Sequence, residues 1–244
     1  MASIGTIFRR EFAGYFITPV AYVFIVIFLA LAAALTFYVG SFFERGRADL
    51  LSFFQWHPWL YLFFMPAISM RLWAEERKTG TIELFLTLPV STAAAVVGKF
   101  LAAWVFAGLA LALTFPIWLT VNYLGEPDNG VIAASYIGSF LLAGAYLAIG
   151  SCLSALTRNQ VIAFVLTVTV CFLFNVLGAG ALQPVLGDAV PAALLETLAS
   201  FSLLSHFNNI VKGVIDLRDL AYYALAIGVW LAAAAITVDL KKAD

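Results

Sequence analysis

The sequence predicts an all-α integral membrane protein with six transmembrane helices, and two observations carry this prediction. Hydrophobic residues make up 64% of the 244 residues and charged residues only 11%, whereas a soluble domain carries about 25% charged residues. Six stretches without Asp, Glu, Lys or Arg also reach or approach the ~20 residues that a helix needs to cross a bilayer. They are continuously apolar, which excludes the alternating pattern of transmembrane β-strands.

We expect a single transmembrane domain over residues 1–244, with spans near 19–43, 53–72, 92–123, 132–156, 161–182 and 220–238. Two shorter charge-poor runs, 84–98 and 197–211, have 15 residues each and are not counted as spans. The first contains Pro89 and the second is rich in Ser, Asn and His, so neither is suited to lipid.

The N-terminal residues 4–16 predict an amphipathic helix that lies in the membrane interface ahead of the first span. Its polar side carries Arg9, Arg10 and Glu11. Its apolar residues recur at helical spacing: Ile4, Ile7, Phe8, Phe12, Tyr15 and Phe16. The apolar run that follows is too long for a cleavable signal peptide. An ordinary frayed terminus is the alternative.

Basic residues predict the orientation of the spans, because cytoplasmic loops of membrane proteins are enriched in Lys and Arg. With six spans and a cytoplasmic N-terminus, nine basic residues lie inside and four outside. The inner nine are Arg9, Arg10, Arg71, Arg77, Lys78, Lys99, Arg158, Lys241 and Lys242, and the outer four are Arg45, Arg47, Lys212 and Arg218. Both termini are therefore expected in the cytoplasm. Trp56, Trp59, Tyr61 and Tyr123 would then form an outer aromatic belt.

Several functional classes are excluded by what the sequence lacks. No charged residue lies in the middle of a span, which disfavours proton relays and ion-coupled transporters. Gly98-Lys99 is not a nucleotide-binding P-loop, because no glycine precedes it at the required spacing and Phe100 follows. The 13 basic and 14 acidic residues leave no positive excess for nucleic acid. We expect no catalytic, cofactor or metal site in this chain.

The remaining candidate ligands and small residues have structural interpretations. His57 and His206 fall on the outer side and are expected to be interfacial polar residues, and Cys152 and Cys171 to be buried free thiols. Small residues crowd the fourth span: Gly138, Gly144, Ala148, Gly150, Ser151 and Ser154. They predict close helix packing, either within the chain or at an interface between subunits.

The longest cytoplasmic connection, from Arg71 to Ser91, predicts a docking element. Gly80 interrupts the helix that leaves the membrane, and Thr81 can cap a new short helix that ends at Pro89. That helix would present Ile82, Phe85 and Leu86 on one side. A solvated loop is the alternative. On the outer side, residues 183–219 predict one or two amphipathic helices at the interface.

At these residues the sequence resembles the permease subunit of a type-2 ABC exporter, and within that family the gliding-motility-type branch. Three stretches carry the resemblance: PAISMRLWAEERKTGTIELFLTLPVS from Pro66, SALTRNQVIAF from Ser154, and SHFNNIVKGVIDLRDLAYY from Ser205. Glu76 and Glu83 match the family's motif, and Gly80 and Pro89 match its turn residues. The likeness extends over essentially the whole chain.

The resemblance implies a subunit of a bacterial cytoplasmic (inner) membrane transporter. It pairs with a second copy of itself or a related permease and with two ATPase subunits, which hold the ATP and magnesium. An accessory protein with a large extracytoplasmic domain often joins them in this branch. The implied elbow helix contains Phe8, Arg9, Arg10 and Phe12. The resemblance assigns the segment after Gly80 to ATPase coupling. We expect the ATPase-docking residues to be Glu75, Glu76, Arg77, Gly80, Thr81, Glu83, Phe85, Pro89 and Arg158. Two alternatives stay open: a non-transporting mechanotransmission or scaffold subunit, and a membrane-embedded enzyme. No residue pattern selects a substrate.

Overall fold

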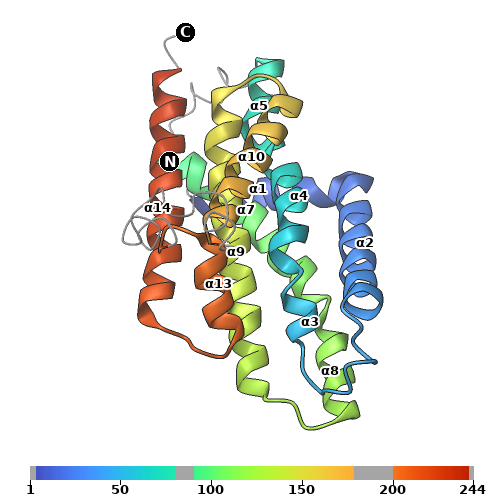
Figure 1. The fold of residues 1–244 in the computed structure, drawn as a ribbon. Coiled ribbons are helices and arrows are strands. Elements are labelled where there is room, and N and C mark those ends of the chain that lie inside the picture. The colour runs from blue at the N-terminus through green and yellow to red at the C-terminus, as the bar shows by residue number, and fades with distance from the viewer. Residues whose placement is uncertain (1–3, 81–90, 179–199, 242–244) are drawn as a thin grey trace.

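The computed structural model describes residues 4–80, 91–178 and 200–241, and every regular element in them is a helix (Figure 1). In chain order these are α1 (Ile4–Ile17), α2 (Pro19–Ala34), the π-helical turn η1 (Leu35–Val39), α3 (Leu51–Phe54), α4 (His57–Ser69), α5 (Arg71–Thr79), α7 (Thr92–Ala112), α8 (Phe115–Leu124), α9 (Asn129–Leu156), α10 (Gln160–Gly178), α13 (Leu203–Val211) and α14 (Leu217–Leu240). The all-α prediction is confirmed.

Five stretches of helix among the described residues are long and apolar enough to cross a membrane. They are Pro19–Val39, Thr92–Leu124, Asn129–Leu156, Gln160–Leu177 and Leu217–Leu240, and each matches a predicted span. The other predicted span, near 53–72, falls instead on α3, α4 and the start of α5. Here α4 has only 13 residues, with Pro58 in its first turn and Pro66 inside it. Because proline lacks the N–H that a helix interior requires, this stretch is not one continuous helix.

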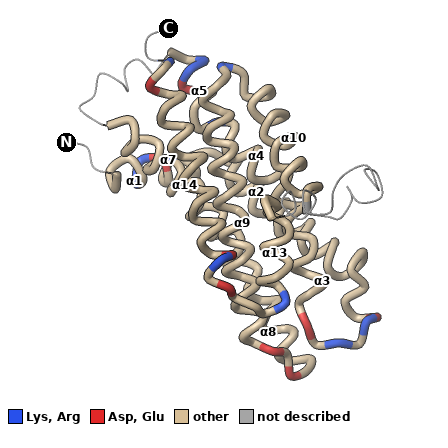
Figure 2. Tube along the Cα trace, turned by 60° about the vertical axis from the view of Figure 1, so that its left-hand side comes forward, with Lys and Arg blue, Asp and Glu red and all other residues tan. Residues whose placement is uncertain are grey.

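Charged residues gather toward the two ends of the bundle and on α1, and a long charge-free region separates them (Figure 2). We call the end with α5, the C-terminus of α9 and the C-terminus of α14 the α5 end. The opposite end, with α8 and the N-terminus of α9, is the α8 end (Figure 1). This distribution is that of a protein whose middle faces lipid, because a charge in the bilayer core is costly.

The central helix is α9, which packs against α4, α5, α7, α10, α13 and α14. Its glycines allow these close contacts. A Cβ at Gly138 would meet Ile210 of α13 at 2.8 Å, one at Gly144 would meet Trp104 of α7 at 2.8 Å, and one at Gly150 would meet the Ser69 Oγ of α4 at 1.9 Å. The small residues of the fourth span therefore serve packing within the chain.

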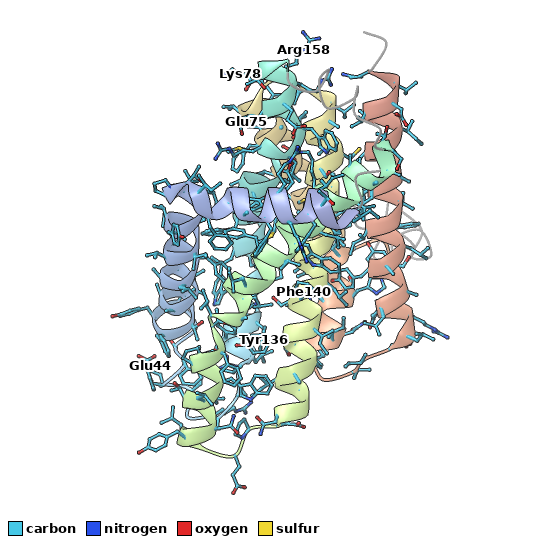
Figure 3. The ribbon with its side chains drawn as sticks, turned by 180° about the vertical axis from the view of Figure 1, so that it is seen from behind. Glu44, Glu75, Lys78, Tyr136, Phe140 and Arg158 are labelled. Carbon is cyan, nitrogen blue, oxygen red and sulfur yellow. The ribbon has the colours of Figure 1, made fainter. Side chains whose placement is uncertain are left out.

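Helix α1 lies crosswise to the spans, on the outside of α7 (Figure 3). Ile7 is buried against Gly98, where a Cβ would come within 2.9 Å of the isoleucine. The Tyr15 ring stacks on Phe106 with 4.8 Å between the ring centroids. The amphipathic helix expected at the N-terminus is present, with one face on the bundle.

Two residues expected at the outer interface lie inside the bundle, so those predictions were wrong. His57 is fully buried and Tyr61 is 1% exposed. Both contact Ser139 of α9: its Oγ is 2.7 Å from His57 Nδ1 and 2.8 Å from Tyr61 Oη. A hydroxyl on the central helix thus contacts both side chains, while the buried His57 Nε2 has no hydrogen-bond partner among the described residues. The packing of α4 against α9 removes both residues from the interface.

The outer amphipathic segment is described only from residue 200 onward, and residues 183–199 lie outside the described part. In the described part of this segment, α13 is the expected helix. Its apolar face does not lie on an interface, however, because Leu203, Phe207 and Ile210 are buried within the bundle, where α13 packs against α9 and α10.

Candidate functional site

The candidate site is the α5 end of the bundle, where the predicted docking residues gather. Helix α5 ends at Gly80, whose φ of 72° is the left-handed conformation that glycine adopts readily at a helix C-terminus. The predicted interruption at Gly80 is therefore confirmed. The docking helix expected after it, with Thr81, Glu83, Phe85 and Pro89, lies outside the described residues.

Lys99 joins three helices at this end. It comes from the second turn of α7 and is 2% exposed. Its Nζ lies 3.2 Å from Glu11 Oε1 of α1 and 2.8 Å from Glu76 Oε1 of α5. It also lies 5.4 Å from the centroid of the buried Trp73 ring, a distance at which a cation is attracted to the face of an indole. One buried cation thus holds α1 and α5 against α7.

Nearby positive charges favour the ionised form of Glu11, the member of this cluster that lies on α1. Burial alone raises the pKa of Glu11, but Lys99 and Arg10 outweigh it and hold the pKa below its ordinary value of 4.5. A carboxyl with a lowered pKa stabilises the folded state above its ordinary pKa. That contribution is lost as the pH falls through the lowered value. The link between α1 and α7 is therefore complete at neutral pH.

The joint between α4 and α5 is fixed to the central helix by Ser154. Its Oγ accepts hydrogen bonds from the backbone N–H groups of Trp73 and Ala74, at 3.2 and 3.1 Å. It donates to the Met70 carbonyl oxygen at 2.9 Å. These backbone groups flank the break between the two helices, where regular helical partners are missing. The Trp73 Nε1 also donates to Ser151 Oγ at 3.2 Å.

The C-terminus of α9 is capped by basic side chains from its two neighbours. Arg77 of α5 donates to the Ala155 carbonyl oxygen at 2.5 Å, and Lys241, just after α14, donates to the Leu156 carbonyl oxygen at 2.7 Å. Cations are favourable here because the last carbonyls of a helix carry partial negative charge. Helices α5, α9 and α14 are therefore bound together at this end.

The other predicted docking residues lie at the surface of the same end. Glu75 forms an exposed ion pair with Arg71, with 3.0 Å between Arg71 Nε and Glu75 Oε2. Arg158 is exposed in the turn between α9 and α10. Figure 3 shows Glu75, Lys78 and Arg158 near one another at this end, far from Glu44. Glu76 differs from the others, because its Oε1 is engaged by Lys99.

The residues expected in the elbow helix divide between two environments. Arg9 and Arg10 are exposed, and Arg10 pairs with Glu11 at 2.6 Å. The half-buried rings of Phe8 and Phe12 stack with 5.6 Å between their centroids. This arrangement gives α1 a basic outer side and an aromatic flank, as an amphipathic helix at an interface requires.

Sequence reasoning missed Lys99 and Ser154 as members of this site. Lys99 was counted only as a cytoplasmic charge, and Ser154 as one of several small residues. The signal that favours a role for Lys99 is its place inside an otherwise apolar helix, since a buried lysine is rare without a partner. No group of three potential metal ligands occurs in the described part of the chain.

A helical bundle with an apolar middle and a polar cluster at one end defines a multi-pass membrane protein. Residues 60–238 match the family model of ABC-2 family transporter proteins, and the chain therefore belongs to that family. No curated protein matches the chain. The chain is thus a membrane permease component of an ABC transporter, a family of transmembrane subunits that are not themselves catalytic.

Proposed function

We propose that this chain is the permease subunit of an ATP-driven exporter, in which separate ATPase subunits dock on the α5 end. The observation that carries the proposal is the attachment of α5. Lys99 ties it to α1 and α7, and Ser154 and Arg77 tie it to α9. Residues 81–90 continue directly from α5, so a force applied to them reaches the central helix.

The proposed topology has six crossings and both termini in the cytoplasm of a bacterial inner membrane. Helices α3, α4 and α5 follow one another from the region of the α8 end to the α5 end (Figure 1), which supports a sixth crossing in three segments. The α5 end is the cytoplasmic end, because it holds most of the basic residues. On this assignment α1 is the elbow helix at the cytoplasmic interface.

The topology predicts a one-sided labelling pattern. Single cysteines at Lys78, Arg158 and Glu126, all exposed positions, are introduced into a chain whose native Cys152 and Cys171 are replaced by alanine. An impermeant thiol reagent should modify positions 78 and 158 only from the cytoplasmic side and position 126 only from the outside. Labelling of positions 78 and 126 from the same side would contradict the six-crossing model.

The proposed assembly contains two permease chains, identical or related, and two ATPase chains that hold ATP and magnesium. The sequence around Gly98-Lys99 is not a P-loop, which supports the proposal that a separate motor supplies the energy. An accessory protein with an extracytoplasmic domain is a further proposed partner on the α8 end. The family does not determine the substrate.

The docking proposal predicts the effect of a double substitution, Phe85→Ala with Glu83→Lys. An aromatic anchor within a polar rim typically costs above 1–2 kcal/mol when truncated, so the variant should insert normally but lose its ATPase on purification. The matched control on the α8 end is Tyr123→Ala with Glu126→Lys, both exposed. Co-purification of the ATPase in stoichiometric amount is measured for both. Normal ATPase binding by the first variant, or its loss by the control, would place the dock elsewhere.

A further inference from the structure

The half-buried His206 of α13 and the buried Asp219 of α14 form a pair that the proposed function does not use. His206 Nδ1 lies 2.5 Å from Asp219 Oδ1, and His206 Nε2 lies 2.9 Å from the Ser200 carbonyl oxygen. Asp219 is 4% exposed. The imidazole ring also stacks on Tyr222 with 3.9 Å between the centroids. The ring therefore faces an acceptor at each of its two nitrogens.

Proton counting shows what this geometry requires. A carbonyl oxygen cannot donate, so His206 Nε2 must carry a hydrogen to bond Ser200. A neutral imidazole has one N–H, so the short contact between Nδ1 and the carboxyl of Asp219 needs a second proton. That proton belongs either to a charged His206 or to a protonated Asp219, and the two groups share it across the short contact.

We propose that this pair is a proton-dependent hydrogen-bonding contact, here called the fastener, that holds residues 200–202, which lead into α13. When the shared proton leaves, the remaining hydrogen stays on Nδ1, where the carboxylate of Asp219 holds it. Nε2 then turns a lone pair toward the Ser200 carbonyl oxygen, and that hydrogen bond is lost. Acidification therefore fastens the segment, and alkalinisation loosens it.

The fastener acts together with two tyrosines of α14. Tyr222 Oη donates to the Phe201 carbonyl oxygen at 2.5 Å, and Tyr223 Oη donates to the Leu203 carbonyl oxygen at 2.8 Å. Three carbonyls around the start of α13 are thus held by side chains, and only the bond to Ser200 depends on the proton. Because α13 packs on α9 at Gly138, the proton state reaches the central helix.

Other ionisable side chains surround the pair on α14, α9 and α10. Tyr222 and Tyr223 of α14 lie against it, with Tyr146 of α9 and Cys171 of α10 beyond them. Tyrosine and cysteine have ordinary pKa values above about 8. Lys212, Asp216 and Arg218, at the ends of the two helices, are exposed. None of them forms an ion pair with His206 or Asp219 among the described residues.

Nitrogen NMR of the full chain in lipid nanodiscs tests the fastener directly. The sequence has two histidines, so His57→Gln or His206→Gln assigns the two imidazole signals. Between about pH 5 and pH 8, the range over which histidine changes charge, the Nε2 of His206 should lose its hydrogen. An Nε2 signal that stays unchanged across this range would overturn the proposal.

Asp219→Asn supplies a matched control. The amide of an asparagine at position 219 can donate to Nδ1, so a neutral His206 keeps its Nε2 hydrogen for Ser200 at every pH. Hydrogen exchange of residues 200–204 is compared between the wild type and Asp219→Asn separately at each pH. The two proteins should exchange at the same rate at pH 5. At pH 8 the exchange should be about fivefold faster in the wild type, as expected for one net hydrogen bond. Equal exchange at both pH values would contradict the fastener.

Discussion

Lys99→Met is expected to destabilise the protein by about 3 kcal/mol. Removal of the buried lysine takes away the cation that Glu11 and Glu76 share, and breaking a buried ion pair by removing one partner is costly. Glu11 and Glu76 both lie within 3.2 Å of Lys99 Nζ and would lose this shared cation, and Glu11 would keep its exposed partner Arg10. Methionine keeps the length and apolar stem of lysine, so the effect reports the charge. The measurement is the free energy of unfolding in mixed detergent micelles.

Two control variants make this result specific. Lys78→Met removes an exposed lysine from the same end and should change the stability by less than about 0.5 kcal/mol. The triple variant Lys99→Met, Glu11→Gln, Glu76→Gln removes all three charges and should recover much of the loss. If the triple variant is no more stable than the single one, the loss comes from packing and not from unpaired carboxylates.

Gly150→Ala is expected to be the second large effect. The new Cβ would meet Ser69 Oγ at 1.9 Å, Ser69 Cβ at 2.6 Å and Thr167 Cγ2 at 3.1 Å. Rotation of the serine hydroxyl relieves only the first contact, so α9 and α4 have to separate. Overpacking of this kind costs about 1–3 kcal/mol.

The matched control is Gly228→Ala in α14, where no atom lies within 4 Å of the new Cβ. Both substitutions gain the same helix propensity, about 1 kcal/mol. The difference between the two variants therefore isolates the clash, and we expect about 2 kcal/mol. Equal stabilities in a thermal unfolding assay would show that α9 and α4 are not in this contact.

Sequence patterns predicted the spans well because bilayer thickness fixes the length of an apolar helix. The start of α2 at Pro19 and the end of α9 at Leu156 agree with the expected spans. The division of the expected second span into α3, α4 and α5 was not predicted. Its charge-free run is long enough for one helix, and the division around Trp56 and Met70 depends on prolines and on backbone contacts with α9. A hydropathy pattern does not contain these contacts.

The candidate site was predicted only in part, for a similar physical reason. Local signals found α1, the end of α5 at Gly80 and the exposed Arg158. The partners of Lys99 are far away in the chain, at Glu11 and Glu76, and periodicity within one helix carries no information on such pairs. Glu76 stays a predicted docking residue, and its Oε1 also contacts Lys99 in the internal cluster.

The central claim is that a separate ATPase subunit binds the chain at the residues that follow α5. Site-specific photo-crosslinking in native membranes tests it, with a photoreactive amino acid at Phe85, at Arg158 or at Glu126. Mass spectrometry of the adducts then shows whether the partner carries a nucleotide-binding P-loop. We predict such an ATPase at positions 85 and 158 and none at position 126. Adducts at position 85 that contain only lipid or other membrane proteins, with the ATPase captured at position 126, would contradict the account.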